Sequence, residues 1–577
     1  MNVIRIALGQ INPVVGGLKE NVRKITQRII EARDKGARLI AFPELSISGY
    51  PPEDLLLKPA FIRSCREALN EVMKASQGII VIVGFPEEHE GDLYNAAAIL
   101  CNGKLSGIYR KHLLPNYGVF DENRYFAASH DNQVYVADGL RFGVTICEDI
   151  WHPTGPHEAQ AALGSAELLI NISASPYQRG KAKMRERMFA VRAGDSLSAV
   201  AFCNIVGGQD ELVFDGGSVV IDPTGNVLAR GHQFQEELVM ADIDEESLLR
   251  QRLLDPHGRK ERIEERKVAV PIEIPVQFQA KMKPSHPLDP SFVMPLGDIE
   301  EVYQALVLGT HDYLTKNGFK SAVIGLSGGI DSALVACVAV DALGASNVMA
   351  VSMPSGYTST ASKEDAAQLA SALGIKLMTI PIEEIFMAFQ RTLEPIFLKG
   401  KADATEENLQ SRIRGMLLMA LSNKFGWLVL TTGNKSEMSV GYATLYGDMA
   451  GGFAVIKDVP KILVYELCRY RNTIKPVIPE NIFKKAPSAE LRPNQKDTDS
   501  LPEYSELDPI LRAYIEQNLS FPEMSTNGFD PRTVQKVVKM VDRAEYKRRQ
   551  APPGVKITPR ALGKDWRLPL TNHFVEE

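Results

Sequence analysis

The alternation of short apolar runs with amphipathic segments constrains this chain more than any other feature of its sequence. Apolar stretches of strand length recur in the first 240 residues, at 3–8, 38–42, 79–84, 94–100, 142–147, 168–172 and 199–206. Residues 21–35 lie between the first two stretches and carry apolar side chains at helical spacing. The pattern predicts an α/β fold for this part of the chain.

The alternation resumes further along the chain and predicts a second α/β domain. Strands are expected at 322–326, 348–352, 376–380 and 428–431. Strands joined through helices at this spacing predict a doubly wound parallel sheet, with its ligand at the carboxyl ends of the strands. Because residues 245–267 are heavily charged and 271–295 are rich in proline, we expect domains at 1–245 and 296–577 and a linker at 246–295.

Composition matters for what it excludes. The residues are 45% apolar and 24% charged, a composition that is ordinary for a soluble globular protein. The chain of 577 residues is too long for a single core, which stops growing at about 250–300 residues. The net charge of −6 is not gathered into a basic run, so no nucleic-acid or membrane partner is expected. Without a membrane-length apolar stretch or a signal-peptide block, a cytoplasmic protein is expected.

The six cysteines are scattered and form no C-x-x-C pair. This spacing fits neither a disulfide framework nor a structural zinc site. Most of them are expected to be small buried side chains.

A strand, a glycine turn and a helix follow one another in the second domain. The predicted strand leads into Ser327-Gly328-Gly329, and the helix begins near Asp331. Paired glycines let the backbone approach an anion, and the helix amides with Ser327 and Ser332 supply donors. Asp331 can hold the magnesium that accompanies a triphosphate. A plain glycine turn with a helix cap is the alternative; a Walker-type loop is excluded because no Gly-Lys precedes Ser or Thr.

The motif S-G-G-I-D-S resembles the pyrophosphate-binding loop of the ATP pyrophosphatases, which transfer AMP to a substrate oxygen and release pyrophosphate. The resemblance implies a parallel sheet of the adenine nucleotide α-hydrolase type. It also implies ATP binding by Gly325, Leu326, Ser327, Gly328, Gly329, Ile330, Asp331 and Ser332.

Three polar residues at or near the ends of apolar runs form a candidate catalytic set in the first domain: Glu44, Lys111 and Cys147. A cysteine needs a base to become a thiolate, which Glu44 can supply, and Lys111 can stabilise the oxyanion formed on attack at an amide. Each residue alone has a simpler explanation: a surface carboxylate, a solvated lysine and a buried cysteine.

The motifs around these residues, F-P-E-L, Y-R-K-H-L-L-P-N-Y-G-V-F-D-E and C-E-D-I-W, resemble the nitrilase/amidase superfamily. The resemblance covers residues 1 to about 240 and implies a nitrilase-like α-β-β-α sandwich with glutaminase activity. It implies that Tyr117, Ser175 and Lys181 contact glutamine and that Glu122 orients the lysine. Packing within loops is the alternative role for Tyr117 and Ser175.

Nearly the whole chain resembles the glutamine-dependent NAD synthetases, through blocks such as E-N-L-Q-S-R-I-R-G, T-T-G-N-K-S-E and E-Y-K-R-R-Q. The resemblance implies that Asn408, Glu437 and Lys547 bind deamido-NAD and that Thr432 binds ATP. It also implies that Glu437 shares Mg²⁺ with Asp331. For Lys547, a solvated helix end is the simpler explanation.

The combination predicts an enzyme whose substrates are glutamine, ATP and deamido-NAD, and a homo-oligomer is expected. Two alternatives remain open from the sequence. In the first, the chain is another enzyme: either a glutamine amidotransferase that acts on a different carboxylate, or a stand-alone amidase whose ATP domain is regulatory. Alternatively, it is a non-catalytic nucleotide-binding assembly protein.

The polar, proline-bearing stretch at 486–508 is too long for an ordinary connection. We expect it to lack a packed core element and to act as a mobile lid over the nucleotides.

Overall fold

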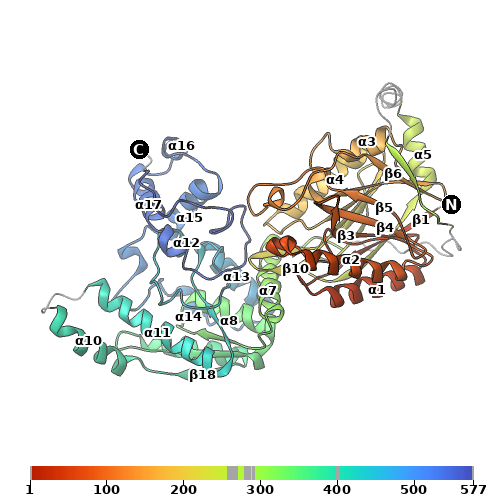
Figure 1. The fold of residues 1–577 in the computed structure, drawn as a ribbon. Coiled ribbons are helices and arrows are strands. Elements are labelled where there is room, and N and C mark those ends of the chain that lie inside the picture. Colours follow the sequence, from red (N-terminus) through yellow and green to blue (C-terminus); the bar gives the residue numbers. More distant parts are fainter. Residues whose placement is uncertain (1–2, 256–270, 279–287, 289–292, 398–402, 575–577) are drawn as a thin grey trace. The chain divides into compact units, whose positions relative to one another are not determined.

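The computed structural model describes residues 3–255, 271–278, 288, 293–397 and 403–574. The chain divides into two compact units (Figure 1). The first comprises Met1–Gln209 and Val213–Leu296, and the second comprises Asp210–Leu212 and Gly297–Glu577.

The linker predicted at 246–295 lies partly outside the described residues. Its described parts include most of helix α5 (Glu245–Leu254) and strand β15 (Ile272–Pro275). β15 pairs in parallel with β6 (Gln133–Ala137), which satisfies its backbone within the first unit. This short piece is therefore regular structure, and the domain boundaries themselves stay a prediction.

Two sheets make up the first unit. The six-stranded sheet has the order β14-β1-β2-β3-β4-β5, and the seven-stranded sheet has the order β13-β12-β9-β8-β7-β6-β15. Besides β6 and β15, the two sheets contain β1 (Val3–Gln10), β2 (Leu39–Ala41), β3 (Ile80–His89), β4 (Asp92–Cys101), β5 (Lys104–Arg110), β7 (Leu140–Ile146), β8 (Leu168–Ser173), β9 (Ala199–Asn204), β12 (Val219–Ile221), β13 (Val227–Arg230) and β14 (Glu237–Asp244). Strands β10 (Val206–Gln209) and β11 (Leu212–Asp215) form a separate two-stranded sheet.

The sheets stack face to face between two pairs of helices. These helices are α1 (Leu18–Asp34) and α2 (Pro59–Ala75) on one side, and α3 (Pro156–Ala162) and α4 (Lys181–Ser196) on the other (Figure 1). In β1, Ile6 and Leu8 join the core between the sheets, whereas Ala7 joins the core beneath α1 and α2. Successive side chains of a strand point to opposite faces, so both faces of β1 are buried and its sequence is continuously apolar. The predicted α-β-β-α sandwich is confirmed.

The second unit is built on a five-stranded parallel sheet with the order β18-β17-β16-β19-β20. Its strands are β16 (Ala322–Gly325), β17 (Val348–Ser352), β18 (Lys376–Thr379), β19 (Leu428–Thr431) and β20 (Phe453–Ala454). Its helices are α7 (Asp298–Lys316), α8 (Ile330–Leu343), α9 (Thr360–Leu373), α10 (Glu383–Phe397), α11 (Ala404–Phe425), α12 (Lys435–Val440), α13 (Lys461–Ile474), α14 (Glu480–Lys484), α15 (Tyr504–Leu511), α16 (Phe521–Thr526), α17 (Pro531–Arg543) and α18 (Glu545–Arg548).

This strand order confirms the predicted doubly wound sheet. Strand order reverses between β16 and β19, which are parallel neighbours. The loops that leave such a pair at its carboxyl ends diverge and form a crevice, where α/β sheets bind their ligands. The Ser327-Gly328-Gly329 turn begins two residues after the end of β16, and Thr432 follows β19 directly.

The expectation that 486–508 lacks a packed core element is wrong. Leu501 and Tyr504 are buried in one core cluster with Leu507, at the start of α15. Tyr504 OH donates to Asp497 Oδ2 at 2.9 Å, and Gln410 Nε2 donates to the Leu491 carbonyl at 2.9 Å. The polar residues of this stretch find partners in the fold, so its composition alone did not reveal that it packs.

Two further features bear on the sequence predictions. All six cysteines are free and buried, as expected. Among the described helices, none combines the length and apolar character that crossing a membrane requires.

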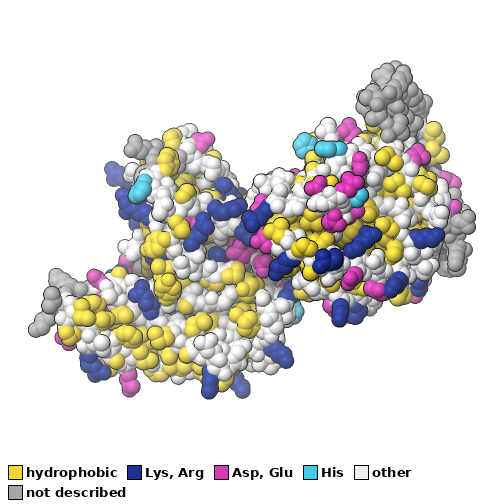
Figure 2. All heavy atoms as spheres, viewed as in Figure 1, with side chains coloured by type: hydrophobic (Ala, Val, Ile, Leu, Met, Phe, Trp, Pro, Cys, Tyr) yellow, Lys and Arg dark blue, Asp and Glu magenta, His cyan; other side chains and the backbone are white. Residues whose placement is uncertain are grey.

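Hydrophobic side chains gather on the surface over α10 and α11 (Figure 2), where Met387, Ile396, Phe397, Met416 and Phe425 are exposed.

Gly84 in β3 lies against the turn that follows β2. A Cβ added at Gly84 would lie 2.3 Å from the Leu45 amide nitrogen and 2.6 Å from the Pro43 carbonyl oxygen. Because these are backbone atoms, Gly84→Ala must displace the turn, and we expect it to lower the free energy of unfolding by about 1–3 kcal/mol.

Urea denaturation checks this expectation, with Gly194→Ala in α4 as the matched control. The nearest atom to a Cβ at Gly194 would be 3.9 Å away, and alanine favours a helix by about 1 kcal/mol over glycine. The control should therefore be neutral or stabilising. Equal midpoints for Gly84→Ala and the unsubstituted chain would contradict the steric argument.

Candidate active sites

Three strand exits of the first unit bring the predicted catalytic residues together. Glu44 follows β2, Lys111 follows β5, and Cys147 follows β7. Glu44 and Lys111 are fully buried, and Cys147 is 4% exposed. The explanations of Glu44 as a surface carboxylate and of Lys111 as a solvated lysine are therefore wrong.

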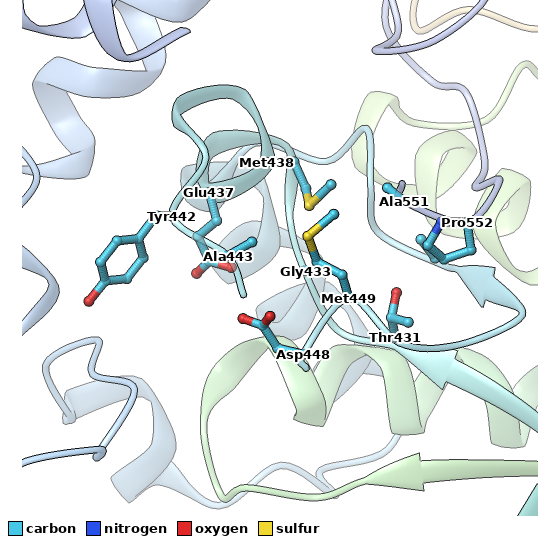
Figure 3. Close-up of a pocket in the computed structure, with 11 residues that line it drawn as sticks. Thr431, Gly433, Glu437, Met438, Tyr442, Ala443, Asp448, Met449, Ala551 and Pro552 are labelled. Carbon is cyan, nitrogen blue, oxygen red and sulfur yellow. The ribbon is translucent and has the colours of Figure 1, made fainter. Parts of the chain in front are cut away.

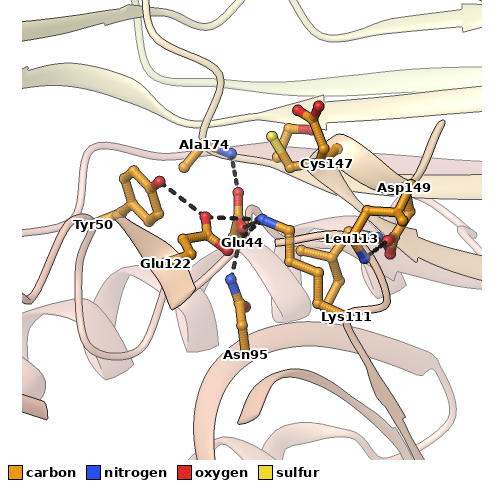
Figure 4. A network of polar contacts seen from close by, with 12 residues as sticks. Glu44, Tyr50, Asn95, Lys111, Leu113, Glu122, Cys147, Asp149 and Ala174 are labelled. Atoms are coloured by element: carbon orange, nitrogen blue, oxygen red, sulfur yellow. Dashed lines mark hydrogen bonds and ion pairs between the residues drawn. The ribbon is translucent and has the colours of Figure 1, made fainter. Parts of the chain in front are cut away.

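The Lys111 ammonium lies between two carboxylates (Figure 4). Its Nζ donates to Glu44 Oε1 at 2.7 Å and to both oxygens of Glu122 at 2.8 and 2.9 Å. Glu44 is also held by Asn95 Nδ2 at 2.7 Å and by the Ala174 amide at 2.9 Å. Glu44 thus has a fixed orientation in a buried site.

Burial and charge set the protonation of this cluster. Burial lowers the pKa of Lys111, but the charges of Glu122 and Glu44 outweigh it and raise the pKa well above its ordinary value. Burial raises the pKa of Glu122 to about 7, against the opposing effect of Lys111. Two buried carboxylates share one cation, so retaining a proton on Glu122 leaves the cluster close to neutral.

Cys147 begins the short 3₁₀ turn Cys147–Ile150 with φ of +45°. A positive φ is uncommon outside glycine and often marks a functional position. Burial and the charge of Glu44 raise the pKa of the thiol, whereas Lys111 lowers it. The thiol therefore stays protonated at rest and needs a base at the moment of attack, which is the role that Glu44 can fill.

Two of the residues predicted to contact glutamine lie beside the Cys147 turn, and the third lies next to Glu44. Tyr117 is exposed, and its hydroxyl donates to both oxygens of Glu148, at 3.0 and 2.9 Å. The Lys181 ammonium lies 5.4 Å from the centroid of the Trp151 ring. Ser175 is buried, with its amide bonded to Asn204 Oδ1 at 2.9 Å, and it follows the residue whose amide holds Glu44.

The glycine loop of the second unit has the geometry expected of an anion-binding turn. Ser327 Oγ and Ser332 Oγ are 3.1 Å apart, and Ser332 Oγ donates to the Gly329 carbonyl at 3.0 Å. Gly328 has φ of +79°, and a Cβ there would lie 2.2 Å from the Ser362 carbonyl oxygen. The first turn of α8 therefore presents its amides at the end of β16.

The two predicted metal ligands share a buried lysine. Lys461, 3% exposed, forms an ion pair with Asp331, and its Nζ lies 3.4 Å from Glu437 Oε1. Asn434 Nδ2 donates to Asp331 Oδ1 at 3.0 Å, and Asn434 Oδ1 accepts from the Glu437 amide at 3.0 Å. Burial raises the pKa of Glu437 to about 8, against the opposing charge of Lys461.

The predicted deamido-NAD residues converge on the loop after α12. Asn408 Oδ1 accepts from Thr444 Oγ1 at 2.8 Å. Lys547 Nζ donates to the carbonyls of Gly441 and Ala443 at 2.7 and 2.8 Å, so Lys547 is not a solvated helix end.

A pocket lies beside this loop (Figure 3). Its lining includes Thr431, Glu437, Tyr442, Ala443 and Asp448. Figure 3 shows the carboxylates of Glu437 and Asp448 turned toward the same open region.

Sequence reasoning missed several residues that complete these sites. Asn95 and Tyr50 belong to the Glu44 cluster, where Tyr50 OH donates to Glu122 at 3.1 Å, and Lys461 and Asn434 belong to the Asp331 cluster. Local sequence does not single them out. The sequence could only have predicted that such partners exist, because buried carboxylates require cations or hydrogen-bond donors.

Comparisons with known proteins identify the class of both units. Residues 5–252 match the family model described as carbon-nitrogen hydrolase, and residues 302–551 match the model described as NAD synthase. The chain therefore joins an amide-hydrolysing type of domain to an NAD synthase type of domain.

Relatives of full length narrow the class to one family. The glutamine-dependent NAD(+) synthetase of Thermotoga maritima is 49% identical over 100% of both chains, and that of Aquifex aeolicus is 49% identical over 99% of this chain and 100% of its own. A solved structure of the Acinetobacter baumannii enzyme, in complex with ADP, is 41% identical, covers 100% of both chains and has a TM-score of 0.74. This chain belongs to the glutamine-dependent NAD(+) synthetase family.

The raised pKa of Glu122 leads to a pH-dependent prediction. Below pH 7 the neutral carboxyl resembles a carboxamide, whereas above pH 7 its charge is added to the cluster. We expect Glu122→Gln to retain a larger share of the amidase rate at pH 6 than at pH 8.5. Initial rates of ammonia release from glutamine at the two pH values measure this ratio.

The matched control is Glu87→Gln, which removes a carboxylate of β3 that pairs at 2.7 Å with Arg110, the last residue of β5. Its relative activity should be the same at both pH values. A Glu122→Gln variant with equal relative activity at pH 6 and pH 8.5 would show that Glu122 does not change protonation in this range.

Proposed function

We propose that this chain converts deamido-NAD to NAD, using ATP to activate the substrate and glutamine as the source of ammonia. The observation that carries the proposal is the presence of two candidate sites in one chain. The buried Glu44, Lys111 and Cys147 cluster is suited to amide hydrolysis, and the glycine loop at the switch point of the parallel sheet is suited to ATP. Family membership supports both assignments.

In the first half-reaction, the Cys147 sulfur attacks the side-chain amide carbon of glutamine. Glu44 accepts the thiol proton and passes it to the departing nitrogen, which leaves as ammonia. Lys111 stabilises the negative charge on the carbonyl oxygen, which is strongest where water is excluded. Water, deprotonated by Glu44, then hydrolyses the thioester to glutamate and restores the thiol.

Tyr117, Ser175 and Lys181 are proposed to hold the glutamine. Tyr117 bonds to Glu148 and Lys181 lies over Trp151, both close to Cys147 in sequence, and Ser175 follows the residue whose amide holds Glu44. These contacts support the role. Lys181 supplies a cation suited to the substrate's α-carboxylate.

In the second half-reaction, residues 325–332 are proposed to bind the ATP phosphates, together with Thr432. Asn408, Glu437 and Lys547 are proposed to bind deamido-NAD beside the pocket in Figure 3. The carboxylate of deamido-NAD attacks the α-phosphorus, pyrophosphate leaves, and ammonia displaces AMP from the resulting anhydride to give NAD.

Asp331 and Glu437 fit Mg²⁺ in their chemistry. Within the described residues no group of three or more metal-ligating side chains gathers, but Mg²⁺ bound with a nucleotide needs one or two carboxylates, with phosphates and water completing the set. The sharing of Lys461 by both carboxylates supports the assignment, because it marks a position that attracts a cation. When bound with ATP, Mg²⁺ neutralises phosphate charge and favours release of pyrophosphate.

The family relationship favours this function over a non-catalytic nucleotide-binding protein and over an amidotransferase for another carboxylate. The cytoplasmic location and the homo-oligomer stay predictions.

Cys147→Ala tests the division of labour between the sites. The variant removes the nucleophile but little volume, so we expect it to lose glutamine-dependent NAD synthesis while retaining synthesis from ammonium salts at alkaline pH. Chromatography of NAD formed from deamido-NAD and ATP, with each nitrogen source, measures both reactions. Cys203→Ala, a buried cysteine outside the cluster, is the matched control and should keep both. Full glutamine-dependent activity in Cys147→Ala would overturn the nucleophile assignment.

Asp331→Ala tests the second site. The variant removes a proposed Mg²⁺ ligand, so we expect the release of pyrophosphate from ATP and deamido-NAD to fall by at least about 10²-fold. Glutaminase activity, assayed without ATP or deamido-NAD, should persist. Asp341→Ala is the control. Asp341 lies on α8, as Asp331 does, but its carboxylate pairs with Arg471 of α13. Undiminished pyrophosphate release at saturating ATP and Mg²⁺ would place the metal elsewhere.

A further inference from the structure

Asp149 has a fully buried carboxylate that the proposed mechanism does not use. Its Oδ1 accepts from the backbone amides of His112 and Leu113 at 3.1 and 2.9 Å. Its Oδ2 accepts from Tyr109 OH at 2.8 Å and from the Ile146 amide at 3.0 Å. One side chain therefore accepts four hydrogen bonds from two separate strand exits.

These four donors bracket two of the three proposed catalytic residues. Tyr109, His112 and Leu113 lie on either side of Lys111, at the end of β5. Ile146 directly precedes Cys147, and Asp149 lies two residues after it, in the same turn. The Asp149 carboxylate thus connects the segment that carries the ammonium to the segment that carries the thiol (Figure 4).

The turn that holds Asp149 is itself fixed on its other side. Asn171 Nδ2 donates to the Cys147 carbonyl at 3.3 Å, and His157 Nδ1 lies 3.3 Å from the Asp149 carbonyl. Arg192 Nε donates to the Ile150 carbonyl at 3.1 Å. Surroundings that over-determine a turn are what allow a residue such as Cys147 to keep a positive φ.

We propose that Asp149 is a positioning residue that sets the distance and direction between the Lys111 ammonium and the Cys147 thiol. The inference rests on the proposed amide hydrolysis and adds a residue to it. A carboxylate suits this role because all four neighbours are donors, and it offers lone pairs on both oxygens. A carboxamide of the same shape would place an NH₂ group against two donors.

Asp149→Asn is the main test, measured on the full chain. Displacing catalytic groups by about 1 Å can cost about 10²-fold in rate, so we expect kcat for glutamine hydrolysis to fall by about that factor. KM for glutamine should change by less than about threefold, because the substrate-binding residues are untouched.

The second readout is the thiol itself. The rate of Cys147 alkylation by iodoacetamide, followed by mass spectrometry of its peptide, reports the thiolate fraction at each pH. The charged groups that face the thiol are Glu44, Lys111, Glu122 and Glu148, of which only Lys111 favours the thiolate. Displacing Lys111 should therefore shift the alkylation midpoint to higher pH, which a general loss of stability would not do. Asp149→Asn also removes a buried negative charge, which acts in the opposite direction, so the charge-neutral variant Tyr109→Phe gives the sign of the shift.

Tyr109→Phe is the milder variant, and it decides the question if Asp149→Asn does not fold. It removes one of the four hydrogen bonds and no charge, so it should lower kcat by less than Asp149→Asn and shift the alkylation midpoint to higher pH. Tyr135→Phe is the matched control: Tyr135 is also a buried tyrosine, but its hydroxyl donates to Gln133 and not to Asp149. It should leave kcat and the alkylation midpoint unchanged.

The outcomes separate this inference from the proposed function. Absence of glutamine hydrolysis in the unsubstituted chain would refute the proposed function. Normal hydrolysis there, with an unchanged kcat and alkylation midpoint in a folded Asp149→Asn or in Tyr109→Phe, would refute the positioning role alone. A fall in the activity of Tyr109→Phe without any change in its alkylation midpoint would also refute it.

Discussion

A buried ammonium between two buried carboxylates is the interaction on which the first unit's site depends. Removing a charge from water costs several kcal/mol, so Lys111 is tolerated only because Glu44 and Glu122 meet it at 2.7–2.9 Å. Those carboxylates need further donors, which Asn95 and Tyr50 provide. The cluster is therefore satisfied only when several strand exits converge, and this requirement links the sandwich fold to its chemistry.

The second unit meets the same constraint with different elements. Lys461 on α13 lies between Asp331 at the start of α8 and Glu437 on α12. In both units one lysine is shared by two carboxylates, one of which lies 67 or 130 positions away in the sequence. The consequence differs, because a cation held beside a thiol favours the thiolate, whereas a cation between two carboxylates occupies a position suited to a metal ion.

Buried polar groups also explain where the pattern of the sequence misleads. The stretch at 486–508 has the prolines and mixed charges of an exposed connection, yet Leu501 and Tyr504 anchor it in a core and Asp497 accepts from Tyr504. Asp149 is similar, since a carboxylate in an acidic motif is ordinarily expected at the surface. Both also receive a donor from a distant part of the chain, Gln410 for the Leu491 carbonyl and Tyr109 for Asp149, which a local pattern does not contain.

The sequence by itself determined the elements, the two α/β classes and the residue types of each site. The spacing of apolar residues indicates which segments become strands and helices. The sequence Ser327-Gly328-Gly329 between a strand and a helix indicates an anion-binding turn. Tertiary structure decided which side chains meet: the pairing of Lys111 with Glu44 and Glu122, the placement of Lys461, and the four donors around Asp149. These contacts join residues up to 130 positions apart. They depend on strand order and register, which only the packed sheets define.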